Sequence, residues 1–474
     1  MTFTVKNVGP IKDISIKLNK LTMLCGKNNS GKTYLLYAMH SLLSYIRRRV
    51  TYEFSDADKE NFCNTGRCSI SVKDIVQSYA SMFNEGFKIS YSEVLARDLA
   101  LPKSKTQSSE VFLSLDKGMN EVISELISSE SRSVRGRYTK DFRLCIGHDE
   151  NSENVVCEYL PQQTMDSQGA DPLFPLQKSA FEAVEWLFPI FVQRFLLRPF
   201  IITCERNGVA MFGAELRLFN SYIFDAGNVE FERLQKVKQK FEFKGYPLPI
   251  RRELEFAMNV RDIEQRTGAL AKNDALLISL AGLTGGSYST SDDMSGWVRF
   301  IPTEESQKSL VISECSSSVR SLVELDYYIR HMSGKNDLLI IDEPELDLHP
   351  SNQRKFARLI ARIVNAGTRV LVATHSDHFA REINSLIAAY SERDDIRRRN
   401  MKILQCNQDE LMSSNDVSCY VITRDSITPM EIEPGFGYPI KSFDDDIQRF
   451  NDAYNELRSS IVHDGEPEDC YGES

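Results

Sequence analysis

The sequence predicts an α/β fold with a parallel-sheet core, an antiparallel β subdomain and helical insertions, one of them like a short coiled coil. Apolar runs of strand length occur at Leu338–Ile341 and Arg369–Ala373, and a helical pattern over Gln353–Asn365 lies between them. A third apolar run, Leu21–Cys25, precedes a glycine-rich turn and the helical pattern of Tyr34–Leu43. Buried strands that alternate with helices are typical of a parallel sheet with helices on its faces.

Antiparallel strands are predicted near the N-terminus and in the middle of the chain. Thr2–Val5 and Ile14–Leu18 alternate apolar and polar residues around a Gly9-Pro10 turn, which predicts a strand pair. Phe142–Tyr159 predicts a second pair with a polar connection, and Pro199–Thr203 predicts a buried strand.

Two long segments have a different pattern and are predicted to be insertions. Residues 51–140 are polar and mostly helical in pattern. Residues 212–267 hold a highly charged helical pattern that Gly245, Pro247 and Pro249 divide in two, so a helical hairpin or short coiled coil is expected. Packing of its halves against each other is the main interpretation, and an arm that binds a partner is the alternative.

The last part of the chain returns to mixed elements. Gly285–Ser313 predicts strands, and Val319–His331 predicts a helix. Near the C-terminus, Val417–Ile422 and Thr428–Ile432 predict strands, and Asp444–Leu457 predicts a helix. The acidic end of the chain is expected to be disordered, because it has little apolar surface to bury.

The glycine-rich turn matches the phosphate-binding loop pattern of glycine, four residues, glycine, lysine and a hydroxyl residue. Gly26 and Gly31 let the backbone direct its N–H groups toward phosphate oxygens, and the N-terminus of the next helix adds a favourable dipole. Lys32 reaches the β- and γ-phosphates, and the Thr33 hydroxyl binds Mg²⁺. The sequence therefore predicts a nucleotide site with Mg²⁺, formed by Gly26, Asn28, Asn29, Ser30, Gly31, Lys32 and Thr33.

Two further strand ends carry residues suited to phosphate chemistry. Asp342 and Glu343 follow the apolar run at 338–341. Asp342 is predicted to hold the Mg²⁺ shell, and Glu343 is placed to activate a water for attack on the γ-phosphate. His375 ends the next apolar run, and its position makes it a candidate contact of the γ-phosphate.

Small hydroxyl residues precede the helix before the carboxylate strand. Ser316, Ser317 and Ser318 begin the predicted helix, where hydroxyl and N–H donors form a second anion site. An ordinary capping cluster is the alternative interpretation. The turn Pro344–Pro350 brings Asp347 and His349 beside the carboxylate site.

Composition restricts the possible classes of protein. The chain has 474 residues, of which 42% are hydrophobic and 26% charged, as in an ordinary globular protein. Its ten cysteines lack zinc spacing, and no apolar run is long enough to cross a bilayer, so a cytoplasmic protein without a membrane segment is expected. A net charge of −10 argues against indiscriminate coating of nucleic acid. The basic cluster Arg47–Arg49 is interpreted as a solvated face, with phosphate or nucleic-acid contact as the alternative.

The order of these motifs resembles that of the ATP-binding-cassette (ABC) ATPase superfamily. Within it, GKNNSGKT, IIDEPELDLHP and ATHSDHF are similar to the RecF/SMC-like branch. They most resemble the stand-alone ATPases of prokaryotic anti-phage defence, such as those of the Septu and PARIS systems and the overcoming-lysogenization-defect proteins. Ile202–Gly208 is similar to a strand–PAER–Gly element of that branch. The resemblance covers blocks near both ends of the chain and shows no match over 51–140 or 212–267.

The resemblance implies Mg²⁺-dependent ATP hydrolysis by these residues. Thr33 and Asp342 would hold Mg²⁺, Glu343 would be the catalytic base, and His375 would contact the γ-phosphate. Ser316–Ser318 would contact the nucleotide of a second subunit. A homodimer or higher homo-oligomer would then close around ATP and open on hydrolysis.

Two departures from the family pattern concern individual contacts. The usual signature Leu-Ser-Gly-Gly-Gln stands here as Cys-Ser-Ser-Ser-Val, which leaves open which serine makes the contact. No Gln-loop is evident, and Glu205 is the candidate for its place. The organisation implied is 1–50 and 141–211 for ATPase lobe I, 51–140 and 212–267 for the insertions, 268–410 for lobe II, and 411–474 for a C-terminal subdomain and tail.

The expected function is an ATPase that acts as sensor or regulator of a separate effector, a nuclease or toxin, in anti-phage defence. The motifs of a TOPRIM or HNH nuclease are not evident in this sequence. The main alternative is a RecF/SMC-like repair or recombination ATPase that grips duplex DNA, whose binding would depend steeply on salt. The ATP-binding subunit of a membrane transporter and a scaffold without ATPase activity are weaker alternatives, and Lys32 with Glu343 argues against the latter.

Overall fold

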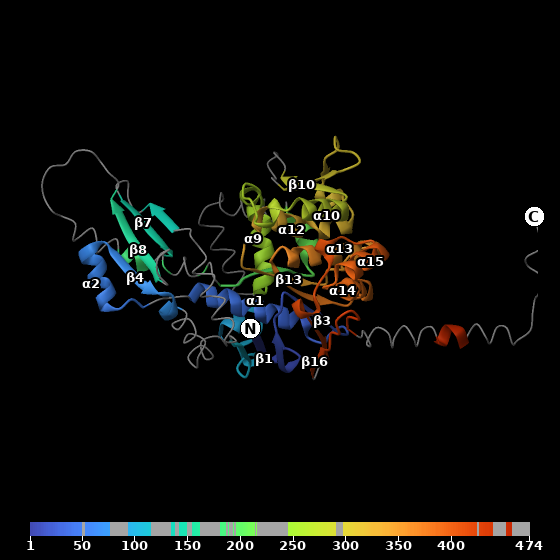
Figure 1. The fold of residues 1–474 in the computed structure, drawn as a ribbon, viewed down its shortest axis with the longest axis horizontal. Helices are drawn as coiled ribbons and strands as arrows, with labels where there is room; N and C mark the ends of the chain where they lie inside the picture. The colour runs from blue at the N-terminus through green and yellow to red at the C-terminus, as the bar shows by residue number, and fades with distance from the viewer. Residues whose placement is uncertain are drawn as a thin grey trace, which may run out of the picture.

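A six-stranded sheet forms the centre of the described molecule (Figure 1). The structure is a computed structural model that describes residues 1–49, 53–75, 93–114, 134–137, 142–148, 154–161, 181–185, 188, 193, 196–213, 215, 245–290, 297–423, 426–438 and 452–456. The strand order is β16-β15-β3-β14-β13-β9. All neighbours are parallel except β15 and β16. The bounds are β3 Leu21–Cys25, β9 Arg198–Ile202, β13 Asp337–Asp342, β14 Arg369–Thr374, β15 Val417–Ile422 and β16 Ile427–Met430.

Helices cover both faces of this sheet, and the apolar residues of its central strands are buried on both sides. Every residue of β3 and of β13 is buried. Leu338 and Ile340 of β13 pack in the core on the side of α1 (Lys32–Arg49). Their neighbours Leu339 and Ile341 pack in the core on the side of α13 (Pro350–Asn365) and α14 (Asp377–Ala389). The predicted parallel core is confirmed.

A smaller antiparallel sheet carries the N-terminus. β1 (Thr2–Val8) lies between β2 (Ile11–Lys17) and β5 (Glu110–Ser114). Val5 pairs with Ile14, so the predicted antiparallel pair is confirmed. The side chains of Phe3, Val5 and Ile16 from this sheet are buried in the same hydrophobic core as side chains of α1.

The segment 51–140 contains strands as well as helices, so its mostly helical prediction is wrong at β4, β5 and β6. A four-stranded antiparallel sheet has the order β4-β8-β7-β6 and lies beside α2, apart from the central sheet (Figure 1). Cys68 and Ile70 are buried and alternate with exposed residues, the two-residue period of a strand. Their partners are more than eighty residues away, at 155–157. The bounds are α2 Asp56–Thr65, β4 Arg67–Ser71, β6 Val134–Arg137, β7 Phe142–His148 and β8 Asn154–Pro161.

The second predicted insertion is helical where the structure describes it. α9 (Leu248–Glu264) begins directly after Pro247, and residues 216–244, the first half of the predicted hairpin, lie outside the described residues. Phe256 of α9 packs in a third core with Trp297 and Tyr327. β10 (Gly286–Thr290), β11 (Val298–Pro302) and β12 (Leu310–Val311) also contribute to that core, whereas α10 (Asp274–Thr284) packs in the core shared with α13.

The predicted helix over Val319–His331 is divided. α11 (Ser317–Ser321), α12 (Val323–Tyr327) and a π-helical turn, η4 (Tyr328–Met332), follow one another. The division lets two consecutive tyrosines be buried in different cores: Tyr327 beside Phe256, and Tyr328 against Phe200 with its hydroxyl on Asp337.

The remaining described elements are short or peripheral. α15 (Asp394–Leu404) packs outside α14, as its label in Figure 1 shows. Of the predicted helix Asp444–Leu457, only 452–456 is described, and it is helical; the acidic end lies outside the described residues. Short 3₁₀ turns are η1 Lys103–Lys105, η2 Leu270–Lys272, η3 Ile312–Glu314, η5 Gln408–Glu410 and η6 Ser414–Asp416.

Candidate nucleotide site

The phosphate loop connects β3 to α1 in a backbone form that needs glycine. Gly26 has φ +155° and Gly31 has φ +99°, and Asn29 between them is left-handed at φ +60°. A Cβ atom on Gly26 would lie 2.3 Å from the carbonyl oxygen of Ile422 on β15. The loop can therefore curl against the sheet only with hydrogen at that position.

Lys32 folds back over the loop that precedes it. Its Nζ donates to the carbonyl oxygens of Gly26 and Lys27, each at 3.0 Å, and to Ser30 Oγ at 3.3 Å. Burial lowers the pKa of Lys32, and the carboxylates of Asp342 and Glu343 partly offset that effect. The ammonium group is thus held by neutral oxygens in a cradle where phosphate oxygens would supply the missing negative charge.

Thr33 and Asp342 meet at the base of the site. Thr33 Oγ1 donates to Asp342 Oδ2 at 2.8 Å, although the residues are 309 positions apart. The other carboxylate oxygen, Asp342 Oδ1, is buried and has no hydrogen-bond partner among the described residues. Burial raises the pKa of Asp342 to about 6, against the Thr33 hydrogen bond, which lowers it.

These residues fit a magnesium ion. Mg²⁺ takes hard oxygen ligands and is commonly bound by one or two protein groups together with substrate phosphates and waters. A hydroxyl, a carboxylate and an unpartnered carboxylate oxygen form such a set. Among the described residues no group of three His, Cys, Asp or Glu could hold a metal by protein ligands alone.

Glu343 and His375 face each other from the ends of adjacent strands. Glu343 follows β13 in a left-handed conformation, φ +51°, and its N–H donates to the Ala373 carbonyl of β14 at 2.9 Å. His375 Nε2 lies 3.7 Å from Glu343 Oε1, too far for a hydrogen bond. Burial and then the charge of Lys32 lower the pKa of His375, with Glu343 acting in the opposite direction. The imidazole is therefore neutral near pH 7.

Glu345 holds the histidine segment, a role that the sequence analysis missed. Its Oε1 accepts from the His375 N–H at 2.6 Å, and its Oε2 accepts from Thr374 Oγ1 at 2.9 Å. The available signal was the second acidic residue of the Asp-Glu-Pro-Glu run. Because both carboxylate oxygens are occupied, Glu345 positions His375 and leaves Glu343 to face the site.

Arg206 was also absent from the predicted site. Its buried guanidinium donates to the carbonyl oxygens of Asp342 at 2.9 Å and Glu343 at 2.7 Å. It also donates to the carbonyls of Thr203 at 2.9 Å and Ser321 at 3.1 Å. One side chain thereby joins the end of β9, the carboxylate turn and α11. Its signal was a position just after a buried strand.

The serine cluster lies apart from the loop of its own chain. Ser316 accepts from the Val319 N–H as the cap of α11, and Ser316 Oγ lies 2.9 Å from Ser318 Oγ. Ser316 is exposed, and Ser317 and Ser318 are half-buried. Within the described residues, no hydrogen bond joins these serines to residues 26–33.

A chain of polar side chains connects α11, which the serine cluster begins, to the turn after Glu343. Arg320 of α11 donates from Nε to Asn207 Oδ1 at 3.0 Å, and Asn207 Nδ2 donates to Asp347 Oδ2 at 2.6 Å. Asp347 is left-handed, with φ +61°. Glu205, the candidate for the missing Gln-loop, is exposed two residues before Asn207, and its N–H donates to Thr203 Oγ1 at 3.1 Å.

Comparison with known families places the chain by sequence. The family described as the AAA ATPase domain matches residues 1–156 and 226–380, more than half of the chain. The chain belongs to this family. The match contains the phosphate loop, the Asp342-Glu343 strand end and His375, so the AAA ATPase domain spans all three parts of the site. A comparison with curated proteins gives no match.

Heads of SMC proteins are among the solved structures that are similar to this chain. One, bound to the C-winged helix domain of ScpA, has a TM-score of 0.34 and 10% identity over 91% of this chain and 97% of that one. The head from Pyrococcus furiosus, bound to the C-terminal domain of ScpA, gives 0.32 and 13% over 96% and 98%. The head from Thermotoga maritima gives 0.27 and 11% over 91% and 98%. Among the described helices, none combines the length and apolar character needed to cross a bilayer.

Proposed function

We propose that this protein hydrolyses ATP with Mg²⁺ and uses the cycle of ATP binding and hydrolysis to control a separate effector. The observation that supports the site is the meeting of Thr33 with Asp342, whose second oxygen is buried and unpartnered. Lys32 is close enough to interact electrostatically with Asp342 and Glu343, and Glu343 in turn faces His375.

Each residue then has a distinct task. Lys32 binds the terminal phosphates in place of the loop oxygens that it now contacts. Thr33 and Asp342 hold Mg²⁺, which when bound neutralises charge on the phosphates. Glu343 orients a water molecule and accepts its proton. His375, neutral near pH 7, donates a hydrogen bond to the γ-phosphate.

Glu343→Gln tests the hydrolytic role. The amide keeps the shape of the side chain but cannot accept the proton, so we expect turnover to fall at least about a hundredfold. Binding of ATP should remain, because Lys32 and Thr33 are unchanged. Phosphate release and nucleotide binding are measured on the same samples, with the exposed Glu305→Gln as the matched control. Wild-type turnover in Glu343→Gln would show that another residue is the base.

The proposed partners are a second copy of the chain and an effector protein. The second copy is supported by the serine cluster, in which Ser316 is exposed and whose hydrogen bonds among the described residues do not reach the loop of its own chain. The defence role, with a nuclease or toxin as effector, is supported by the motif resemblance of GKNNSGKT, IIDEPELDLHP and ATHSDHF.

Affinity purification from the native host tests the effector. Wild type and Glu343→Gln are compared under Mg-ATP, and bound proteins and nucleic acids are identified. A single nuclease-like or toxin-like protein retained more strongly by one nucleotide state supports the proposal. Duplex DNA without a protein partner contradicts it and favours a repair or recombination ATPase.

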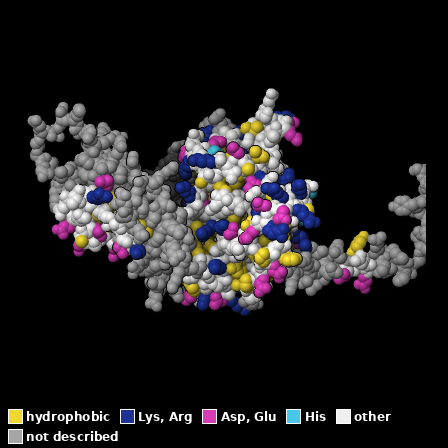
Figure 2. Space-filling model, in the orientation of Figure 1, with side chains coloured by type: hydrophobic (Ala, Val, Ile, Leu, Met, Phe, Trp, Pro, Cys, Tyr) yellow, Lys and Arg dark blue, Asp and Glu magenta, His cyan; other side chains and the backbone are white. Residues whose placement is uncertain are grey.

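One surface feature favours that second function. Lys and Arg side chains gather over α15 in Figure 2, where the helix contributes Arg397, Arg398, Arg399 and Lys402. Acidic residues, Asp394 and Asp395, begin the same helix. If this surface binds duplex DNA, charge reversal of Arg398 and Arg399 should weaken binding and reduce its salt dependence.

A further inference from the structure

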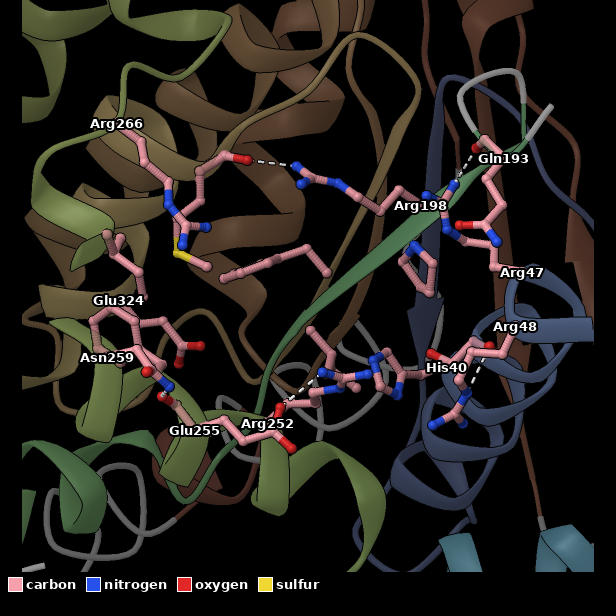
Figure 3. Close-up of a pocket in the computed structure, with 17 residues that line it drawn as sticks. His40, Arg47, Arg48, Gln193, Arg198, Arg252, Glu255, Asn259, Arg266 and Glu324 are labelled. Carbon is pink, nitrogen blue, oxygen red and sulfur yellow. Dashed lines mark hydrogen bonds and ion pairs between the residues drawn. The ribbon is translucent and has the colours of Figure 1, made fainter. Parts of the chain in front are cut away.

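A second polar cavity lies away from the nucleotide site. It has a volume of about 570 Å³ and is enclosed by the second half of α1, by β9 and by α9. Figure 3 shows side chains from α1 and α9 reaching into it from opposite sides. The phosphate loop precedes α1, whereas the first cavity residue on that helix is His40, about 12 Å further along the helix axis. None of the proposed ATP-site residues lines the cavity.

Positive charge exceeds negative charge around this cavity. Its lining contains two carboxyl groups, Glu255 and Glu324, and five arginines: Arg47, Arg48, Arg198, Arg252 and Arg266. Glu324 is buried, and burial followed by the neighbouring Glu253 carboxyl raises its pKa well above the usual value. The charged form of Glu324 is thus disfavoured, so this carboxyl offsets the charge of the arginines less than an exposed carboxylate would.

The carboxylates near the cavity already form ion pairs with arginines. Arg198 pairs with Asp337 at 2.6 Å, and Arg252 pairs with Glu255 at 2.7 Å. Arg48 reaches Asp98 only at 4.0 Å, because Arg97 and Arg251 contact that carboxylate at 3.1 and 3.3 Å. Arg266 is exposed at the rim, without an ion pair among the described residues.

His40 adds an unpartnered polar atom to the same wall. The side chain is 2% exposed, and its Nδ1 has no hydrogen-bond partner among the described residues. Figure 3 shows Arg252 reaching from α9 toward His40. Burial and then the charges of Arg252 and Arg48 lower the pKa of His40 to about 3. A neutral imidazole can donate one N–H to an anion, and a bound anion would offset the positive charges of Arg252 and Arg48 near it.

We propose that this cavity, the arginine pocket, binds a phosphorylated small molecule of about nucleotide size. A guanidinium group can donate two parallel N–H hydrogen bonds to two oxygens of a phosphate, which favours phosphate over a monatomic anion such as chloride. The volume is within the range of small-molecule sites. The rings of Phe200 and Phe256 also line the pocket and offer an apolar wall for a base or other ring.

The pocket is connected to the turn that carries the catalytic carboxylate. Glu324 of the lining lies against Glu253, and Glu253 Oε1 accepts from the Thr203 N–H at 2.6 Å. Thr203 in turn presents its carbonyl to Arg206, which holds Asp342 and Glu343. A bound phosphate compound that moves Glu324 therefore changes the support of Glu343. This regulatory part rests on the proposed ATPase function.

Binding is tested without ATP hydrolysis. Inorganic pyrophosphate and AMP are titrated calorimetrically into full-length Lys32→Ala protein, in which the phosphate loop is impaired. Both probes should bind, and Arg252→Gln with Arg266→Gln should weaken binding about tenfold or more, because each change removes a charged donor. Arg261→Gln, on α9 outside the pocket, is the matched control and should change affinity less than twofold.

Three results would overturn the proposal. These are the absence of binding at millimolar probe, equal weakening in the Arg261 control, and binding of a short oligonucleotide but of neither small probe. Stronger binding of AMP than of pyrophosphate identifies a nucleotide-like ligand, and the reverse identifies a polyphosphate. Both sources satisfy the proposal.

Regulation is measured separately as steady-state ATP hydrolysis with and without AMP. AMP should change the turnover of the wild type by at least about threefold and leave Arg252→Gln/Arg266→Gln unaffected. An equal effect on both proteins would show that AMP acts at the phosphate loop. If the protein fails to hydrolyse ATP at all, the proposed function fails, while the binding titration still decides the pocket.

Discussion

Individual ionisable side chains in the nucleotide site are held in unfavourable surroundings. Burial lowers the pKa of Lys32 and raises that of Asp342 to about 6, so each charged form is disfavoured by its environment. A phosphate beside Lys32 and a metal ion beside Asp342 would each favour the charged form. The pKa shifts of Lys32 and Asp342 thus have opposite signs, and the joint binding of nucleotide and Mg²⁺ would stabilise the charged forms of both side chains.

His40 supplies a prediction about pH at the residue scale. Its folded pKa is about 3, against 6.5 when unperturbed, with Arg252 and Arg48 as the facing charges. As pH falls below 6.5, His40 binds a proton in the unfolded chain but not in the folded chain. The free energy of unfolding therefore decreases as pH falls from 6.5 toward 3. Relative to His40→Gln, the wild type should lose about 2 kcal/mol of unfolding free energy by pH 5.

Denaturant unfolding of both proteins between pH 7.5 and 5 measures this difference. Glu253 and Asp326, whose pKa values burial raises to about 7 and about 6, act in the opposite direction. They are present in both proteins, so their contributions cancel in the comparison. Parallel pH profiles would show that His40 is protonated in the fold.

At the scale of elements, Arg206 connects three parts of the chain that are distant in sequence. Arg206→Lys keeps the charge but cannot reach four carbonyl oxygens at once, so the turn at Asp342 and Glu343 should lose its support. We expect turnover to fall about tenfold or more, with a smaller change in KM, since the turn acts on the chemical step. Stability should fall by about 1–3 kcal/mol, because buried acceptors are left unpaired.

Steady-state kinetics and denaturant unfolding test this change together. Arg393→Lys is a matched control, since Arg393 is exposed and pairs with the neighbouring Asp395. Unchanged turnover in Arg206→Lys would show that the carboxylate turn holds its form without the guanidinium.

The elements that the sequence predicted well are those with local signals. β3, β13 and β14 are continuous apolar runs, and their ends carry the predicted Cys25-Gly26, Asp342-Glu343 and Thr374-His375 junctions. A phosphate loop likewise combines its glycines, lysine and helix start within eight residues. Parallel pairing then brings the strand ends together, so the proximity of Glu343 to His375 was predictable.

Features that depend on distant pairing were not predictable in the same way. β4 has only five residues. Its alternation of buried and exposed side chains identifies a strand only because β4 pairs with β8. Arg206 donates to three carbonyl groups that are more than a hundred residues away, and a backbone acceptor has no sequence pattern that would identify it. Glu345 was recognisable only once Thr374 and His375 lay beside it.

At the scale of the whole molecule, strands of the central sheet lead to both proposed anion sites. The phosphate loop follows β3, and the turn holding Glu343 follows β13, while the arginine pocket includes β9 residues 198–201, before the Thr203–Arg206 turn. β9 is therefore the strand that touches both: its residues line the pocket, and the turn after it holds the carboxylates. A signal between the two sites has three direct routes: this strand, α9 beside it, and α1, which begins at Lys32 and carries His40 of the pocket.

The serine cluster predicts a dimer whose sites are shared between subunits. We expect Ser316–Ser318 of one subunit to complete the γ-phosphate site of another. The mass of the Glu343→Gln protein should then double with Mg-ATP, because ATP binding forms the dimer and the variant cannot hydrolyse ATP to release it. Adding Ser318→Arg should keep the protein monomeric, since the larger side chain would occupy the interface. Ser313→Arg, exposed just upstream of the cluster, is the control. Light scattering after size-exclusion chromatography measures the masses.

A mixing experiment then decides whether the sites are shared. Lys32→Ala removes the phosphate lysine but keeps the serines, and Ser318→Arg alters the serines but keeps the lysine. Each variant alone should be inactive. A mixed dimer of the two contains one site with both an intact Lys32 and an intact Ser318, so mixing should restore part of the wild-type turnover. No recovery on mixing, with Ser318→Arg still inactive, would mean that the serines act within their own chain, because a second subunit could not then supply them.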